Sequence, residues 1–241
     1  MISKYVIANL KMNMTASETS EYLNVLNNSL FLSNVIICPT SIFIPYFLNH
    51  NYDVGIQNVY IENSGPYTGE VSPKQARSIG VKYAIIGHSD RRQMGEDDEL
   101  INKKIKKCLE NKIKVVFCIG ETLEQREMLK TDKVLKQQIV RGLREINSRQ
   151  LKNILIAYEP VWAVGTNAMP SNKDISDCAE FIKNICKTTL DGIPFILYGG
   201  SINEKNINSL KTLKNVDGFL IGASSCDAYK LTKIIDIIDH Q

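Results

Sequence analysis

The chain has 241 residues, of which 44% are hydrophobic and 23% are charged, as in an ordinary globular protein. This composition excludes a wholly disordered chain. The 29 Lys and Arg residues and 26 Asp and Glu residues leave a formal charge of +3, which is too small to indicate a nucleic-acid partner. The length alone allows one large domain or two small ones.

Several features that the sequence lacks indicate the cellular compartment of the protein and whether it needs a cofactor. The six cysteines form no C-x-x-C pair, and the first residues do not have the charged-then-apolar profile of a signal peptide. No apolar run approaches the roughly 18 residues of a membrane span. Only three histidines are present. We therefore expect a soluble cytoplasmic protein with no metal, no cofactor and no membrane partner.

Short runs of apolar and β-branched residues recur along the chain and predict eight strands. In chain order they are residues 5–10, 34–38, 54–58, 83–87, 114–119, 153–158, 194–198 and 217–221. Several of these runs are unbroken apolar stretches, which are typical of parallel strands covered on both faces.

Amphipathic segments lie between the predicted strands. Residues 15–18 (Thr-Ala-Ser-Glu) match a capping box, which predicts a helix from Thr15 to about Ser29. Apolar residues at helical spacing mark residues 97–111, 121–148, 174–190 and 228–238. The lysines within 97–111 are expected to form a solvent-exposed face. A nucleic-acid role rests only on the lysines of 103–114 and is not expected.

This alternation of strands and helices, without a linker or a change in composition, predicts one α/β domain over residues 1–241. Eight units fit a closed (β/α)8 barrel, for which about 250 residues is the usual size. An open doubly wound sheet remains the structural alternative, although its G-x-G-x-x-G fingerprint does not follow the first strand.

In such a barrel, the carboxyl ends of the strands meet on one rim and build the functional site. Polar residues and glycine-rich turns follow five of the predicted strands there. They are Asn9 and Lys11 at the end of the first strand, His88 after the fourth, Glu159 after the sixth, Gly199-Gly200-Ser201 after the seventh, and Gly222-Ala223 after the eighth.

These groups predict a specific chemistry. Glycine-rich turns expose backbone N–H groups that suit a phosphate dianion. Glu159 lies between an apolar strand and Pro160, and a partly desolvated carboxylate is a good base. His88 begins a helical turn, where the dipole favours a neutral imidazole that can donate to a substrate oxygen. Lys11 and Asn9 can stabilise an enolate oxygen. Together they predict proton abstraction beside the carbonyl of a small phosphorylated sugar.

Over essentially its whole length, the chain resembles the triosephosphate isomerase family. The resemblance rests on eight segments in order, namely Asn9-Leu-Lys, Gln57-Asn-Val, Tyr67-Thr-Gly-Glu, Ile86-Gly-His-Ser-Asp-Arg-Arg, Cys118-Ile-Gly-Glu, Ala157-Tyr-Glu-Pro-Val-Trp-Ala-Val-Gly-Thr, Tyr198-Gly-Gly-Ser and Gly218-Phe-Leu-Ile-Gly. It implies reversible interconversion of dihydroxyacetone phosphate and D-glyceraldehyde 3-phosphate through an enediol(ate), in glycolysis and gluconeogenesis.

The resemblance also implies a role for each matching residue. Glu159 is the expected base and His88 the neutral electrophile, with Lys11 and Asn9 at the enediolate oxygens. The expected phosphate-binding residues are Gly165, Ser201, Gly222 and Ala223. Residues 160–170 are the expected lid, which excludes water because an exposed enediol phosphate can lose its phosphate.

A homodimer is implied as well, through a loop from Tyr60 to Glu70 whose Thr68 reaches the partner's Lys11 and Asn9. The chain departs from the family pattern at three places: Asp90 stands where glutamate is usual, Asn167 and Pro170 alter the end of the lid, and Ala223 replaces a glycine. Asp90 is nevertheless expected beside the lysine.

Two other functions compete with this interpretation. One is an isomerase of the same mechanism that acts on a four-carbon ketose phosphate, motivated by the altered hinge and by Ala223. The other is a non-catalytic phosphate-binding barrel, which is disfavoured because Glu159, His88 and Lys11 are all present.

Overall fold

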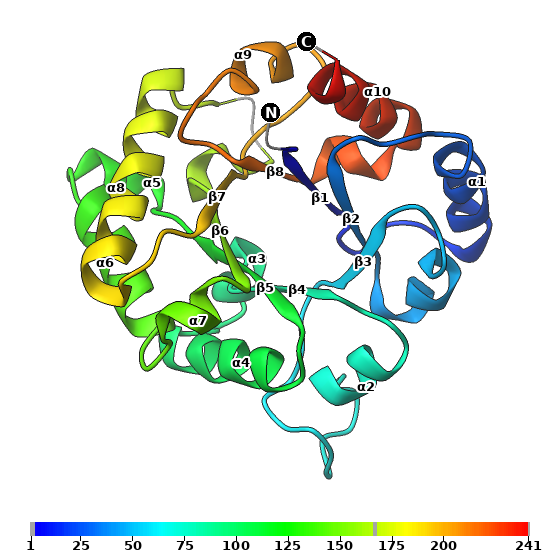
Figure 1. Cartoon of the computed structure of the whole chain (residues 1–241), viewed down its shortest axis with the longest axis horizontal. Helices are drawn as coiled ribbons and strands as arrows, with labels where there is room; N and C mark the ends of the chain where they lie inside the picture. Colours follow the sequence, from blue (N-terminus) through cyan, green and yellow to red (C-terminus); the bar gives the residue numbers. More distant parts are fainter. Residues whose placement is uncertain (1–2, 166–167, 241) are drawn as a thin grey trace.

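Eight parallel strands form a closed barrel in consecutive order in the computed structural model, which describes residues 3–165 and 168–240. Figure 1 looks along this barrel, with the strands in the centre and the helices around them. The strands are β1 (Tyr5–Asn9), β2 (Asn34–Cys38), β3 (Asp53–Ile56), β4 (Tyr83–Ile86), β5 (Lys114–Ile119), β6 (Ile154–Tyr158), β7 (Phe195–Tyr198) and β8 (Gly218–Ile221).

Helices of very different length connect the strands. The α-helices within the described residues are α1 (Ala16–Leu26), α2 (Pro73–Ser78), α3 (Ser89–Gln93), α4 (Asp98–Glu110), α5 (Leu123–Glu127), α6 (Thr131–Gly142), α7 (Ser148–Leu151), α8 (Asn172–Leu190), α9 (Ile207–Leu210) and α10 (Ala228–Asp239). Three 3-10 helices accompany them, η1 (Ser41–Phe47), η2 (Val161–Ala163) and η3 (Ala223–Cys226). None of the helices in the described part of the chain is long and apolar enough to cross a membrane.

Pairing of β1 with both β2 and β8 closes the barrel, and every strand pair is parallel. Alternating side chains then divide into two apolar clusters. Ile7, Ile85, Val116 and Leu197 belong to the cluster that fills the barrel, while their neighbours along the strands pack against the surrounding helices. Both faces of each strand are therefore buried, which explains the unbroken apolar runs.

The single-domain barrel predicted from the alternating pattern is confirmed, and the open-sheet alternative is wrong. Strands β2 and β5 have the predicted bounds, β3 differs by one residue at its start and two at its end, and each of the others differs by one residue at one end. Thr15 caps α1 in the predicted capping box, although the helix ends at Leu26 rather than near Ser29.

Two helix predictions need correction. Residues 121–148 do not form one segment, because the chain turns between α5 and α6 at Leu129, whose φ is +54°. The lysines of 97–111 do not all face solvent either. Lys104 is only 3% exposed, and its Nζ lies 2.6 Å from Glu96 Oε1 and 2.8 Å from Asn58 Oδ1. A buried carboxylate and an amide oxygen thus replace the water that a lysine normally requires.

Candidate active site

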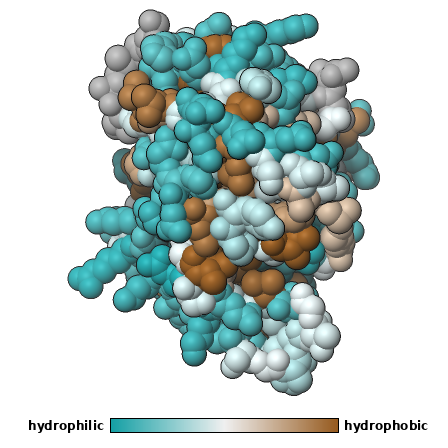
Figure 2. Space-filling view, turned by 90° about the vertical axis from the view of Figure 1, so that its right-hand side faces the viewer, coloured by the Kyte–Doolittle hydropathy of each residue, from teal (hydrophilic) through white to brown (hydrophobic). Residues whose placement is uncertain are grey.

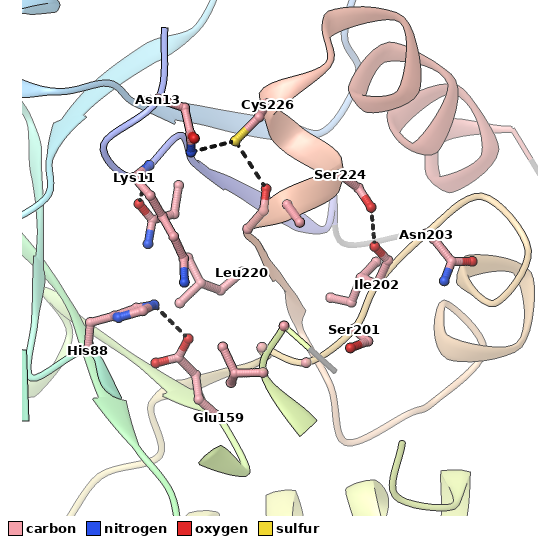
Figure 3. Close-up of a pocket in the computed structure, with 17 residues that line it drawn as sticks. Lys11, Asn13, His88, Glu159, Ser201, Ile202, Asn203, Leu220, Ser224 and Cys226 are labelled. Carbon is pink, nitrogen blue, oxygen red and sulfur yellow. Dashed lines mark hydrogen bonds and ion pairs between the residues drawn. The ribbon is translucent and has the colours of Figure 1, made fainter. Parts of the chain in front are cut away.

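A cavity of about 330 Å³ opens at the carboxyl ends of the strands. Its walls include every residue that the sequence assigned to catalysis or phosphate binding. These are Asn9, Lys11, His88, Glu159, Gly165, Ser201, Gly222 and Ala223. Figure 3 shows that Lys11, His88 and Glu159 point into the same space. The barrel therefore brings together residues that lie more than 200 positions apart in the chain.

Glu159 and His88 are in direct contact at the floor of this cavity. His88 Nε2 lies 3.3 Å from Glu159 Oε1, and both residues are buried (Figure 3). The main chain of Glu159 is fixed because its N–H donates to the Ile119 carbonyl of the neighbouring strand. Gly199 leaves room for the carboxylate, since a Cβ there would come within 2.7 Å of Glu159 Cγ.

The hydrogen bonding of His88 selects one tautomer of the neutral ring. His88 is the N-cap of α3, and its Nδ1 accepts a hydrogen bond from the Asp90 N–H at 3.0 Å. Because Nδ1 is an acceptor, the proton of the neutral imidazole resides on Nε2. The ring therefore presents an N–H group to the cavity, on the side where Glu159 lies.

Lys11 occupies a strained position beside these two residues. Its φ of +49° lies in the left-handed region, which costs a residue other than glycine about 1–3 kcal/mol. Three groups hold it there: Asn9 Oδ1 accepts from the Lys11 N–H, and Gln57 Nε2 and Thr40 Oγ1 donate to the Lys11 carbonyl. The loop after β1 is thus held by the loops after β2 and β3.

Asp90 retains an ion pair with Lys11 although it is one methylene shorter than the usual glutamate. Lys11 Nζ lies 3.1 Å from Asp90 Oδ2, and the same oxygen lies 3.5 Å from His88 Nδ1. Asp90 does not line the cavity itself. Its carboxylate instead pairs with the ammonium group of Lys11, which does line the cavity.

The turns after β7 and β8 form another part of the cavity wall. Ser201 follows β7, and its Oγ donates to the carbonyl of Ala163 in the loop after β6. Gly222 and Ala223 follow β8, and Ala223 does not adopt a positive φ, so its side chain introduces no strain. Asn167, one of the two residues expected to alter the end of the lid, lies outside the described residues, as does its neighbour Thr166.

Thr68 is not near the cavity of its own chain. It lies on the exposed loop of residues 60–70, which projects from the barrel at the bottom of Figure 1. Within this loop, the rings of Tyr60 and Tyr67 lie 4.6 Å apart, and the Tyr60 N–H donates to the carbonyl of Val71. The loop therefore has internal packing of its own.

Sequence reasoning missed several residues that build the site. Gln57 and Thr40 fix Lys11, and the motif containing Gln57 was the available signal. Glu121 is fully buried after β5 and accepts hydrogen bonds from Tyr158 Oη and Trp162 Nε1. It thereby joins the end of β5 to the loop that follows Glu159. Its position directly after a predicted strand was the signal that could have found it.

Nothing in the described residues suggests a metal centre. No group of three or more His, Cys, Asp or Glu side chains is arranged to hold a metal ion within residues 3–165 and 168–240. All six cysteines are free, and Cys118 lies in the barrel interior, where burial and the nearby Glu159 raise the pKa of its thiol.

A carboxyl group and an imidazole in contact, with a lysine beside them at the carboxyl ends of barrel strands, define a (β/α)8-barrel enzyme suited to proton transfer on an anionic substrate. Comparison with known proteins identifies the family within this class. The family model for triosephosphate isomerase matches residues 4–238.

Curated relatives match over nearly the full length. A triosephosphate isomerase of Thermodesulfovibrio yellowstonii is 42% identical, over 98% of this chain and 99% of the relative. Those of Mycoplasmoides gallisepticum and Clostridium botulinum are 38% and 37% identical, over 98% of this chain and 98% and 100% of the relatives. The chain therefore belongs to the triosephosphate isomerase family, as its motifs indicated, and it is an isomerase.

Proposed function

We propose that this enzyme interconverts dihydroxyacetone phosphate and D-glyceraldehyde 3-phosphate, with Glu159 as the base. The 3.3 Å contact between Glu159 Oε1 and His88 Nε2 carries the proposal, because it puts a base and a hydrogen-bond donor within reach of one small substrate. Proton removal from the carbon beside a carbonyl needs both groups at once, since charge develops on the oxygen as the proton leaves.

In the forward direction, Glu159 removes a proton from C1 of the ketose, and the electron pair of that C–H bond forms the C1–C2 double bond. The C2 carbonyl oxygen becomes the enediolate oxygen. His88 donates its Nε2 proton to this oxygen, and the charge of Lys11 together with the amide of Asn9 stabilises it. Glu159 then returns the proton to C2, while the C1 hydroxyl passes its proton to the deprotonated Nε2 of His88 and becomes the aldehyde, so that both side chains regain their starting protonation states.

The phosphate is bound by backbone N–H groups of the segments that follow β6, β7 and β8. The residues proposed to supply them are Gly165, Ser201, Gly222 and Ala223, all of which line the cavity. Backbone amides suit a dianion because they donate without bringing a competing counter-charge. Residues 160–170 form the proposed lid, which keeps water from the enediolate and so suppresses loss of phosphate.

We also propose a homodimer formed through the loop from Tyr60 to Glu70, with Thr68 directed to the partner subunit's Lys11 and Asn9. Large apolar side chains are exposed in the segments after β1, β2 and β4: Met12 (91%), Ile42 (72%) and Tyr46 (51%) in η1, and Met94 (73%). Figure 2 shows apolar patches on one side of the molecule, above the projecting loop. Such patches are typical of interfaces.

Light scattering of the purified protein tests this assembly. The expected mass is twice the chain mass of 27.1 kDa. A monomer of full activity would contradict the proposed role of Thr68. The six free cysteines support a reducing compartment, so we propose a cytoplasmic enzyme that acts in glycolysis and gluconeogenesis.

The Glu159→Gln variant tests the proposed base. Glutamine has nearly the same shape but cannot accept the proton, so kcat should fall by roughly 10²–10⁴ while folding and inorganic phosphate binding persist. Glu127→Gln, an exposed substitution in α5, is the matched control and should retain wild-type activity. Activity of Glu159→Gln within tenfold of this control would overturn the assignment and favour a different base.

Substrate preference distinguishes the remaining alternatives. Wild-type kcat/KM is expected to be higher for dihydroxyacetone phosphate than for erythrulose phosphate. A tenfold preference for the tetrose, about 1.4 kcal/mol, would assign the enzyme to a four-carbon ketose phosphate instead. Absence of turnover with both, alongside tight phosphate binding, would support a non-catalytic barrel.

A further inference from the structure

The connection between β6 and α8 is attached to the turn after β7 at two separate places. On its N-terminal side, the carbonyl of Ala163 accepts a hydrogen bond of 2.8 Å from Ser201 Oγ. On its C-terminal side, Met169 Sδ lies 2.9 Å from Asn206 Nδ2. Asn206 is outside the cavity wall and has no role in the chemistry proposed above. This second attachment therefore needs a separate explanation.

The Asn206 side chain uses both ends of its amide. Its Oδ1 accepts from the Asn203 N–H at 2.9 Å, while its Nδ2 donates to the Ser201 carbonyl at 2.7 Å as well as approaching Met169. A backbone N–H must face an oxygen and a backbone carbonyl must face an N–H, so these partners determine the orientation of the amide. In this orientation, the remaining donor faces the Met169 thioether, which is a weak acceptor.

The contacts of Asn206 lead directly to the wall that receives phosphate. Ser201 and Asn203 both line the cavity, as Figure 3 shows. Asn206 does not line it but is hydrogen-bonded to the backbone of each of them. Met169 in turn packs against the main apolar core, and Ser171 two residues later caps α8. Asn206 thus joins the phosphate-binding turn to the point where the β6–α8 connection enters the body of the protein.

We propose that Asn206, acting through Met169, is a positioning residue that sets the C-terminal end of the β6–α8 connection relative to the phosphate-binding turn. This inference rests on the proposed function of the same cavity. Gly165 lies in the connection and Ser201 in the turn, so their amides can serve one phosphate only when the two segments are held together. Loss of this contact should therefore weaken the binding of phosphate-bearing substrates and leave the turnover of phosphate-free substrates unchanged.

The Met169→Leu variant is the central test, because leucine retains the apolar volume and removes only the thioether acceptor. Loss of one net hydrogen bond corresponds to roughly a two- to tenfold change in affinity. KM for D-glyceraldehyde 3-phosphate and the calorimetric Kd for inorganic phosphate should both rise by this factor. Turnover of D-glyceraldehyde, which has no phosphate, should stay within twofold of wild type.

Met128→Leu is the matched control. Met128 Sδ also lies near an amine, Lys130 Nζ at 3.2 Å, but in the turn after α5 and outside the cavity. This variant should leave all three measurements unchanged. Asn206→Ala should raise KM and Kd at least as much as Met169→Leu, because it also removes the hydrogen bonds of the amide to Ser201 and Asn203. The double variant should be no worse than Asn206→Ala alone, because both substitutions break the contact between Asn206 and Met169. If Asn206→Ala fails to fold, Met169→Leu alone decides.

Two results would overturn the inference. One is equal phosphate affinity in Met169→Leu and Met128→Leu. The other is a loss of activity of Met169→Leu with D-glyceraldehyde as large as its loss with D-glyceraldehyde 3-phosphate, which would indicate a general structural defect. Failure of the proposed function is recognised separately, because wild-type protein would then not isomerise D-glyceraldehyde 3-phosphate at all. The calorimetric Kd values of Met169→Leu and Met128→Leu would still show whether the contact between Asn206 and Met169 affects phosphate binding.

Discussion

Gly120 offers a test of how closely the backbone around Glu159 is packed. A Cβ added at Gly120 would lie 1.8 Å from the carbonyl oxygen of Glu159 and 3.2 Å from the nitrogen of Pro160. The main chain of Gly120 cannot easily move away from Glu159, because its N–H donates to Gln138 Oε1 and its carbonyl accepts from Gln138 Nε2. Its φ lies outside the left-handed region, so alanine is unfavourable there only because of these contacts.

The size of the effect follows from the shift that Gly120→Ala imposes. Real Cβ atoms essentially never approach another atom within 3.0 Å, so the Glu159 main chain and residue 120 must separate by at least 1.2 Å. A displacement of about 1 Å at a reacting group costs roughly 100-fold in rate. Overpacking should also cost about 1–3 kcal/mol of stability, or about 2–4 °C in Tm for each kcal/mol.

The assay is kcat for D-glyceraldehyde 3-phosphate, measured below the Tm of the variant. Gly192→Ala is the control, because the Cβ there meets only the flexible end of Leu151 at 2.9 Å, far from the cavity. We expect a kcat about 100-fold below that of the control. A Gly120→Ala enzyme within twofold of Gly192→Ala would refute the argument that the main chain after β5 positions Glu159.

Three further predictions concern stability and reactivity. Ser171→Ala removes the hydroxyl that accepts from the Asp174 N–H, so the free energy of unfolding measured by urea titration should fall by about 1 kcal/mol. An unchanged urea midpoint would contradict this role of the cap. Lys104→Met should cost about 3 kcal/mol because it removes a partner of the buried Glu96 carboxylate, and a loss below 1 kcal/mol would be inconsistent with burial of the pair. Partial burial raises the pKa of Cys226, so iodoacetamide should modify it slowly at pH 7.5 and faster as the pH rises; rapid modification at pH 7.5 would contradict this.

The barrel was predictable because its determinants are local and repeated. Each strand is a short apolar run, and the consecutive order of eight parallel strands follows from their regular alternation with helices. The exceptions depended on tertiary contacts. Lys104 lies on a helix whose sequence reads as a solvated face, and only the folded chain places Glu96 and Asn58 around it. Propensity does not describe such partners.

The site was predictable to a similar extent and for a similar reason. Glu159, His88 and Lys11 each follow a predicted strand directly, so the barrel architecture alone places them on one rim. Groups that act through these residues were harder to recognise. Gln57 holds the strained Lys11 from another loop, and Asn206 lies in a polar turn like any other surface asparagine. Their contacts arise only when the loops meet.

Isomerisation in D₂O tests the central claim of proton transfer through an enediolate most directly. If Glu159 removes the C1 proton of dihydroxyacetone phosphate, the carboxyl group can exchange with solvent before it protonates C2. NMR should then detect deuterium at C2 in a fraction of the D-glyceraldehyde 3-phosphate formed. Product that carries only protium at C2, at every extent of reaction, would instead indicate direct hydride transfer and contradict the proposed mechanism.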